Sequence, residues 1–329
     1  MATATQTDQL ERLEAALAEG GAGPRRRMLV IINPYATTVS DRLKNLVVYA
    51  LRGSYEVTAI ETEARAHATE LCREAATEGY EVVVAFGGDG TVNEAANGLA
   101  GTATPLTCLP GGRANVYCRM LGIPADVVDA TEHLLRIADA FEPRLVDLGC
   151  LNDRYFAFSA GVGLDADVVE RVDARPRLKA RYGQWFYTWV AVRTFSRRYL
   201  FHGARLEAEV GPEPIGGVTA VVQNGSPYTY FADRPVHIAE GTELDSGELC
   251  GVVLERASAL DVPSIVWRAL SKRVALTGHP HVRQFAGVRE LRVRSCDERP
   301  LPLQVDGDYI GEAPEAVFGI RLRGLAVVS

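Results

Sequence analysis

The chain has 329 residues, of which 47% are hydrophobic and 23% are charged, and its formal net charge is -7. This composition is that of a globular protein with one large domain or two ordinary ones. The negative charge argues against nucleic-acid binding and against general adhesion to anionic membranes, and leaves only local basic patches for such contacts.

The six cysteines show no Cys-x-x-Cys spacing, which predicts reduced thiols in a cytoplasmic protein and not a zinc site. Residues 1–27 are predicted to be an N-terminal extension, since a helical pattern over residues 8–19 ends in a Gly- and Pro-containing break. Residues 1–23 lack the apolar stretch of a secretory signal. The longest apolar runs, such as residues 81–86, are too short to span a bilayer, which needs about 20 residues.

From residue 28 the pattern predicts strands alternating with helices. Strands are expected at 28–33, 55–60, 81–86 and 105–109, and helices at 40–51, 64–78, 91–100, 115–121 and 125–141. This alternation is typical of a parallel sheet with helices on both faces. We therefore expect a three-layer α/β domain over residues 28–146.

After about Asp147 the pattern changes to many short strand-like runs separated by Gly, Pro, Asn and Asp. The runs are 155–160, 206–210, 218–223, 248–254, 291–294, 301–305 and 318–321. Such a series predicts an antiparallel β-sandwich over residues 147–311, interrupted by helices at about 165–198 and 260–276.

Two glycine turns follow strands of the predicted parallel sheet. Gly87-Gly88-Asp89-Gly90-Thr91 lies between a strand and a helix, and Pro110-Gly111-Gly112 lies in the same context one unit later. Such turns leave backbone N–H groups open to phosphate, and the dipole of the following helix attracts negative charge. Glycines also close purely structural turns, and neither the P-loop nor the complete dinucleotide fingerprint is present.

Asp89 places a carboxylate inside a candidate phosphate site. This arrangement is electrostatically unfavourable unless the carboxylate binds a metal or takes a proton. Phosphoryl transfer needs such a group to orient the attacking hydroxyl and to accept its proton. The alternative is that Asp89 caps the helix that follows.

At these residues the chain resembles the diacylglycerol kinase catalytic family, which includes bacterial lipid kinases and sphingosine kinases, and most closely its actinobacterial-type members. The motifs that carry the resemblance are Ile32-Asn33-Pro34, Phe86–Glu94, Leu109–Asn115, Phe158–Ala166, Leu244–Gly247 and Val305–Asp308. The resemblance implies an α/β domain and a β-sandwich domain, with ATP bound between them. It also implies that residues after about 312 return to the α/β domain.

The resemblance implies a set of nucleotide contacts and a catalytic pair. Nucleotide contacts are expected at Asn33, Pro34, Thr37, Thr62, Gly87, Gly88, Gly90, Thr91, Asn93, Glu94, Gly112, Arg113 and Asn115. Asp89 would help to activate the acceptor hydroxyl, and Asp308 would be the general base. Together they would bind the magnesium that accompanies ATP. A structural Asp306-Gly307 turn would give the same sequence pattern.

Three positions depart from the family pattern. Arg113 stands where many members have Thr or Ser, so it either contacts phosphate or obstructs the site. Asp308 replaces the commoner glutamate and is shorter by one methylene. In the turn that would hold a structural magnesium, Ser246 follows Asp245 where the family has a second aspartate.

Residues 171–198 hold eight basic side chains and one acidic one, a local charge of +7, with interleaved aromatics. We expect this segment to contact an anionic leaflet, through Arg175, Arg177, Lys179, Arg181 and Trp185. The alternative is a helix with an aromatic core face and a solvated basic face.

The sequence thus predicts a cytoplasmic enzyme, peripheral on the inner leaflet, that uses ATP and Mg²⁺ to phosphorylate a lipid hydroxyl, most simply diacylglycerol. Dimers occur among relatives, so a homodimer stays open. One alternative is a kinase for a soluble acceptor such as NAD, because NAD kinases share a related GGDG turn. Another is a catalytically weak nucleotide- or lipid-binding protein, which the departures from the family pattern at Arg113 and Ser246 would support.

Overall fold

The computed structural model describes residues 25–36, 39–138, 141–175, 178, 182, 184–194, 204–211, 213–231, 233–256, 258, 261–271, 274–297 and 299–329. The chain forms two compact units. Unit 1 comprises the described residues up to Val146 together with Arg323–Ser329, and unit 2 comprises Asp147–Leu322. The predicted N-terminal helix at residues 8–19 lies outside the described residues.

Unit 1 is built on a parallel sheet with the strand order β2-β1-β3-β4-β18. The strands are β1 (Arg26–Ile32), β2 (Tyr55–Glu61), β3 (Val82–Gly87), β4 (Leu106–Pro110) and the end of β18 (Glu315–Val327). β3 is buried along its whole length, as expected for a central strand covered on both faces. Val327 of β18 pairs with Leu106 of β4, so the last strand of the chain completes this sheet.

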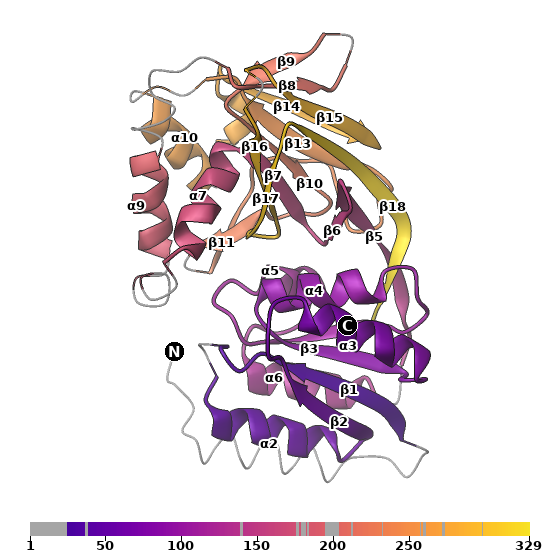
Figure 1. The fold of residues 1–329 in the computed structure, drawn as a ribbon. Helices are drawn as coiled ribbons and strands as arrows, with labels where there is room; N and C mark the ends of the chain where they lie inside the picture. Colours follow the sequence, from indigo (N-terminus) through magenta and orange to yellow (C-terminus); the bar gives the residue numbers. More distant parts are fainter. Residues whose placement is uncertain are drawn as a thin grey trace. The chain divides into compact units, whose positions relative to one another are not determined.

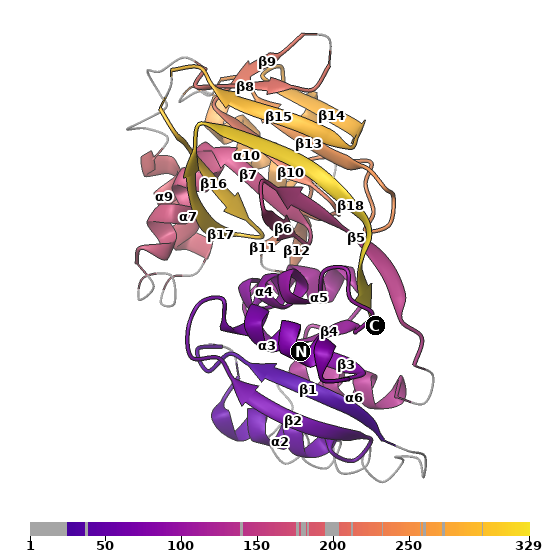
Figure 2. The same cartoon turned by 45° about the vertical axis from the view of Figure 1, so that its right-hand side comes forward.

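Helices cover both faces of this sheet (Figure 1). α3 (His67–Thr77) packs against α4 (Asp89–Leu99), and α2 (Asp41–Leu51) packs against α6 (Val127–Arg136). Figure 2 shows the two pairs on opposite faces of the sheet. Two predicted helices are shorter than expected. α3 starts at His67 because Ala66 has a left-handed φ of 65°, and α6 ends at Arg136.

Unit 2 contains an antiparallel sheet with the order β14-β13-β10-β7-β16-β17. These strands are β14 (Val282–Val288), β13 (Leu249–Leu254), β10 (Thr219–Gln223), β7 (Ser159–Gly163), β16 (Leu301–Val305) and β17 (Asp308–Ala313). A second layer contains β18, β5 (Arg144–Leu151), β6 (Arg154–Phe156), β15 (Glu290–Ser295), β8 (Leu206–Glu209) and β9 (Ile215–Gly217). Buried side chains of both layers, such as Val162, Val222, Val293 and Phe318, form one core. The predicted sandwich is confirmed.

Helices lie on the outer side of the first of these sheets. α7 (Leu164–Asp173) packs against α9 (Gln184–Thr194) through an apolar cluster that includes Val172, Phe186 and Val190. α10 (Asp261–Leu270) and the short helix η2 (Leu276–Gly278) cover a second cluster, as does the hairpin of β11 (Thr229–Phe231) and β12 (Arg234–Val236). Within 165–198, where helical structure was predicted, the described residues contain α7 and α9.

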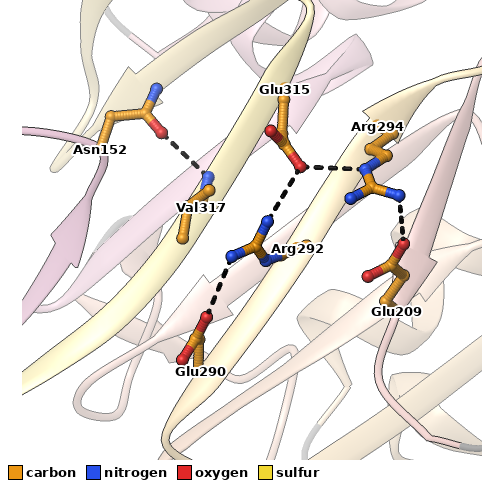
Figure 3. A network of polar contacts seen from close by, with 7 residues as sticks. All are labelled: Asn152, Glu209, Glu290, Arg292, Arg294, Glu315 and Val317. Carbon is orange, nitrogen blue, oxygen red and sulfur yellow. Dashed lines mark hydrogen bonds and ion pairs between the residues drawn. The ribbon is translucent and has the colours of Figure 1, made fainter.

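The surface of the layer formed by β8, β15 and β18 carries a ladder of cross-strand ion pairs (Figure 3). Arg294 contacts Glu315 and Glu209, each at 2.9 Å, and Arg292 lies 3.6 Å from Glu315. These side chains are partly exposed, and such pairs contribute about 0–1 kcal/mol each to stability. Asn152 accepts a hydrogen bond of 2.9 Å from the backbone N–H of Val317 and so ties β18 to the loop after β5.

None of the described helices combines the length and the apolar character that crossing a membrane would require.

Candidate active site

The first loop of the candidate site follows β1 and is fixed by Asn33. Its backbone N–H donates to the carbonyl of Phe86, and its side-chain Nδ2 donates to Thr91 Oγ1 at 3.1 Å. Its Oδ1 accepts from the N–H of Tyr35, which closes an Asx-turn. Asn33 therefore ties the loop after β1 to β3 and to the start of α4.

Lys44, which the sequence analysis did not single out, supports the same loop. Its side chain is only 4% exposed, and its ammonium donates to the carbonyl of Pro34 at 3.1 Å and to Asp41 at 3.2 Å. A lysine inside a helix is ordinarily taken as a surface residue. The usable signal was its position on the apolar face of α2, with Val47, Val48 and Leu51.

The two glycine turns pack backbone against backbone. The N–H of Gly111 donates to the carbonyl of Gly87 at 2.8 Å. A Cβ at Gly112 would lie 2.8 Å from the Cα of Gly88, and one at Gly111 would lie 3.0 Å from the Cα of Gly87. Only glycine permits this approach. The pair of turns places unblocked backbone at the carboxyl ends of β3 and β4, where open α/β sheets bind ligands.

Asn115 closes the second turn on itself. It adopts a left-handed φ of 45°, accepts from the N–H of Gly112 at 2.8 Å and donates to the carbonyl of Gly112 at 2.7 Å. The short helix α5 (Val116–Met120) starts at the next residue. Asn115 thus fixes the turn through its side chain, and a contact with nucleotide remains a prediction.

Asp89 is the first residue of α4, and Gly88 before it provides no side-chain cap. Its Oδ1 accepts a hydrogen bond of 3.1 Å from the N–H of Tyr117, in the first turn of α5. The carboxylate is therefore held by the element after the second turn. The thiol of Cys118 has a raised pKa because it is hydrogen-bonded to Cys108 and buried, and the negative charge of Asp89 raises it further.

Glu94 is engaged in capping α3. Its two oxygens accept from the backbone N–H groups of Ala66 at 2.9 Å and Ala68 at 3.3 Å, at the N-terminal end of that helix. Thr69 also donates to the Glu94 carbonyl at 2.8 Å. A carboxylate at a helix N-terminus satisfies open N–H groups and complements the helix dipole. The structure thus gives Glu94 a structural function, and its predicted nucleotide contact stays a prediction.

The remaining predicted nucleotide residues of unit 1 lie at the ends of the same strands. Thr62 follows β2, and its N–H donates to the carbonyl of Ile32 at 2.9 Å. Asn93 is buried in α4, where its side chain and carbonyl both accept from Asn97, and Arg113 is exposed in the second turn. Thr37 lies outside the described residues. The fold thus gathers the described members around the glycine turns.

Asp308 lies in unit 2, just after a tight turn between β16 and β17. Asp306 and Gly307 both have positive φ, 47° and 83°, as in the two-residue hairpin turns that favour Asp-Gly. Asp306 is 5% exposed, and its oxygens accept from the N–H groups of Ala157, Phe158 and Ser159 at 2.7, 3.0 and 3.0 Å. Asp306 therefore has a structural function in this turn, as the alternative of a structural Asp306-Gly307 turn predicted. That Asp308 and Asp89 share one cluster stays a prediction, because they lie in different units.

The predicted structural-metal turn around Asp245 is closed by protein groups. Asp147 accepts from the N–H of Gly247 at 2.8 Å, and the hydroxyls of Thr242 and Ser246 lie 2.9 Å apart. Asp245 itself is exposed. Across the part of the chain that the structure describes, no three His, Cys, Asp or Glu side chains are grouped as metal ligands. A metal at Asp245 therefore stays a prediction.

The predicted membrane segment is only partly described. Arg175 is exposed and donates to the carbonyl of Arg171, whereas Arg177, Lys179, Arg181 and the side chain of Trp185 lie outside the description. On α9, Phe186 is buried but Trp189 is 54% exposed, with Arg193 stacked 5.1 Å from its ring centroid. A hollow of about 460 Å³ between α7 and α9 is lined by Arg171, Arg175, Arg193 and Trp189, among others. The aromatic residues of this segment are thus divided between core and surface.

Comparisons with known proteins agree with this arrangement. Residues 27–142 match the family model of the diacylglycerol kinase catalytic domain. A diacylglycerol kinase of Staphylococcus haemolyticus is 26% identical over 301 residues, covering 90% of this chain and 86% of the relative. One from Staphylococcus aureus is 27% identical over 296 residues, covering 88% of each chain. The crystal structure of a putative diacylglycerol kinase from Bacillus anthracis has the same fold, with a TM-score of 0.71 at 20% identity, over 93% of this chain and 98% of its own.

The fold, the family model matched by residues 27–142 and the similar kinases together define a two-domain lipid kinase whose phosphate donor is ATP. The chain carries a diacylglycerol kinase catalytic domain over residues 27–142. The predictions of family, fold class and lipid-kinase activity are therefore confirmed.

Proposed function

We propose that this protein transfers the γ-phosphate of ATP to the free hydroxyl of diacylglycerol and so forms phosphatidic acid. The observation that carries the proposal is the position of Asp89: it opens α4 between two mutually packed glycine turns and is oriented by the N–H of Tyr117. The names of the relatives, which match about nine-tenths of the chain, support diacylglycerol as the acceptor.

The glycine turns and the start of α4 bind the phosphates. Backbone N–H groups and the positive end of the α4 dipole attract the triphosphate, and the close Gly88–Gly112 approach leaves no side chain in its way. Arg113, exposed beside this loop, adds a positive charge suited to phosphate. Asn33, Asn115 and Lys44 keep the surrounding loops in place, so the phosphate site is formed before ATP arrives.

A carboxylate takes the proton of the acceptor. As the lipid oxygen forms its bond to the γ-phosphorus, the bond to the β-phosphate oxygen breaks and ADP leaves. The hydroxyl proton passes to Asp308 as the general base, while Asp89 orients the attacking oxygen. Positioning and charge stabilisation account for the remaining rate enhancement, because phosphoryl transfer needs little covalent chemistry from the protein.

Asp89 and Asp308 are also the residues that would hold magnesium. Carboxylate oxygens are hard donors of the kind that Mg²⁺ prefers, and the ion would neutralise charge on the β- and γ-phosphates. Asp245 is a weaker candidate, because its turn is already closed by Asp147, Thr242 and Ser246.

We further propose that the helices α7 and α9 bring the enzyme to an anionic membrane surface. The exposed Trp189, the exposed Arg175 and Arg193 of the α7–α9 hollow, and the basic residues Arg177, Lys179 and Arg181 of the sequence support this contact. Sedimentation with vesicles checks it. Vesicles containing phosphatidylserine should bind more protein than phosphatidylcholine vesicles, and the charge reversals Arg175→Glu and Arg193→Glu should remove the difference. Equal binding to both vesicles would contradict it.

The catalytic proposal is tested by transfer of labelled γ-phosphate from ATP, with magnesium, to lipids in mixed micelles. Wild-type protein should label diacylglycerol in preference to sphingosine or soluble NAD. Asp89→Asn should lower turnover about 10³-fold while keeping an acceptor for the Tyr117 N–H. Asp129→Asn, in the first turn of α6, is the matched control and should leave turnover unchanged. A labelled soluble acceptor with no labelled lipid would overturn the proposal.

A further inference from the structure

Asp165 is a carboxylate that the proposed mechanism does not use. It lies in the first turn of α7, just after β7, and its residue is only partly exposed. Its Oδ1 accepts from the hydroxyl of Tyr228 at 2.7 Å, and its Oδ2 accepts from Nε2 of Gln304 at 2.7 Å. Gly161 leaves room for this contact, since a Cβ there would collide with the Asp165 carboxylate. Burial raises the pKa of Asp165, and its two hydrogen-bond donors oppose that shift.

Gln304 connects Asp165 to the turn that precedes Asp308. It is fully buried in β16, at an irregularity where the pairing register with β17 shifts. Its Oε1 accepts from the backbone N–H of Gly307 at 2.9 Å. Because that N–H can only donate, the amide oxygen must face Gly307, and the amide NH₂ must face Asp165. Without an acceptor at Asp165, the buried amide NH₂ would lose this partner, and the amide orientation would no longer be fixed from both sides.

Both residues of the turn are anchored. Asp306 is held by the three N–H groups of residues 157–159, and Gly307 is held by Gln304. Asp308 follows directly and opens β17 opposite Val305. Asp308 thus follows a turn that the Gln304 amide holds, and that amide in turn donates to Asp165.

We propose that Asp165 is a positioning residue for Asp308: it holds Gln304 in the orientation that fixes the Asp306-Gly307 turn and so the aim of the Asp308 carboxylate. The proposal rests on the proposed role of Asp308 in lipid phosphorylation. It assigns to Asp165 an acceptor function, which an amide can also supply, and not proton transfer, which an amide cannot.

Two substitutions separate these roles. Asp165→Leu removes the acceptor, so kcat should fall at least about 20-fold while the KM for ATP stays within about twofold. Asp165→Asn can keep its carbonyl toward Gln304 while its NH₂ donates to the Tyr228 hydroxyl, so kcat should stay within about threefold of wild type. If Asn is as damaging as Leu, the charge itself is needed and the proposal is overturned. If D165L retains full kcat, it is overturned as well.

Two further measurements test the path through Gln304. Gln304→Met, which keeps the volume but offers no amide, should lower kcat as much as D165L does, and it replaces D165L if that variant does not fold. In an Asp308→Asn background, D165L should cost at most about twofold more, because both act through one group. If D165L lowers kcat in the Asp308→Asn background as much as it does in wild type, the proposal is contradicted. Asp167→Leu, which removes a buried carboxylate paired with Arg171 on the same helix, should leave kcat unchanged.

Hydrogen exchange gives a readout that does not depend on activity. The Gly307 amide should exchange at least about tenfold faster in D165L than in wild type, and D165N should match wild type. Unchanged exchange in D165L would overturn the proposal even if kcat falls. If wild-type protein labels no diacylglycerol, the proposed function fails, and exchange at Gly307 still decides whether Asp165 holds this turn.

Discussion

The two turns that carry the proposed catalytic carboxylates are held by different means. In unit 1, Asp89 follows glycines that pack against the backbone of a second turn, within about 25 residues along the chain. In unit 2, Asp308 follows a turn held by side chains: Asp306 binds backbone nearly 150 residues away, and Gln304 is in turn held by Asp165. One turn depends on the absence of side chains, and the other depends on particular side chains.

This difference has a consequence for mutation. A turn made by close backbone approach is damaged by adding atoms, and its local partners limit how far the damage spreads. A turn anchored by a buried carboxylate is damaged by removing atoms, and the backbone donors left behind lose their partners. Four substitutions test the comparison, beginning with the largest expected loss of stability.

Asp306→Ala should destabilise the protein by about 4 kcal/mol, because three buried N–H groups lose their acceptor and alanine disfavours the left-handed backbone of this residue. Asp306→Asn is the control: it tolerates the left-handed backbone and keeps Oδ1, which serves Phe158 and Ser159, so it should cost about 2 kcal/mol. Urea unfolding of both variants is the measurement. Equal losses would mean that the hydrogen bonds from the N–H groups of Phe158 and Ser159 contribute nothing.

Gly112→Ala should cost about 2 kcal/mol, since its Cβ would lie 2.8 Å from the Gly88 Cα and neither backbone can move freely. The KM for ATP should also rise, because the proposed phosphate site includes this contact. Gly319→Ala adds the same methyl in β18, where nothing lies within 4 Å, and should leave both quantities unchanged. Stability and KM are measured on the two variants together. A tolerated G112A would contradict the packing argument.

Glu94→Gln should cost about 1 kcal/mol, because α3 loses the charge at its N-terminus and one of two acceptors. The KM for ATP should stay within about twofold, as expected if the carboxylate serves the helix. Thermal unfolding and steady-state kinetics with varied ATP measure the two effects. A tenfold rise in the KM for ATP at unchanged stability would show instead that Glu94 contacts the nucleotide.

Arg294→Ala should change stability by less than about 0.5 kcal/mol, although it removes two ion pairs from the surface of unit 2. Any loss should shrink as sodium chloride is raised from about 0.05 to 0.5 M, since salt screens exposed charges. The measurement is the free energy of unfolding in urea, for wild type and Arg294→Ala, at both salt concentrations. A loss above 1 kcal/mol that salt does not alter would show that this ladder anchors β18 by packing.

The sequence allowed unit 1 to be predicted almost element by element. Its strands are continuous apolar runs, such as residues 82–86, and its helices have local start signals, such as Ser40 before α2. Local patterns also placed the glycine turns at strand ends. Two predicted helix bounds were wrong: α3 starts only after Ala66, which has a left-handed φ, and α6 ends at Arg136.

What the sequence could not reveal are contacts between residues far apart in the chain. Nothing local pairs Asp165 with Gln304, which is 139 residues away, and nothing near Lys44 announces that its ammonium holds the Pro34 carbonyl. The family resemblance implies a nucleotide contact for Glu94, but nothing in that motif indicates that its carboxylate also caps a different helix, α3. Polar side chains in folded proteins form hydrogen bonds with whichever groups the fold brings near them. The hydrophobic periodicity of the sequence does not indicate these partners.

The strand β18 passes from unit 2 into unit 1, where Val327 pairs with Leu106 and the Gly324 carbonyl accepts from Gly101. During synthesis, residues 26–136 leave the ribosome long before this strand does, so the sheet of unit 1 waits with the β4 edge unpaired until all of unit 2 has been made. An unpaired parallel edge invites other chains. Nascent chains stalled before residue 323 should therefore be the species of this protein that chaperones bind most, and completion of β18 should release them.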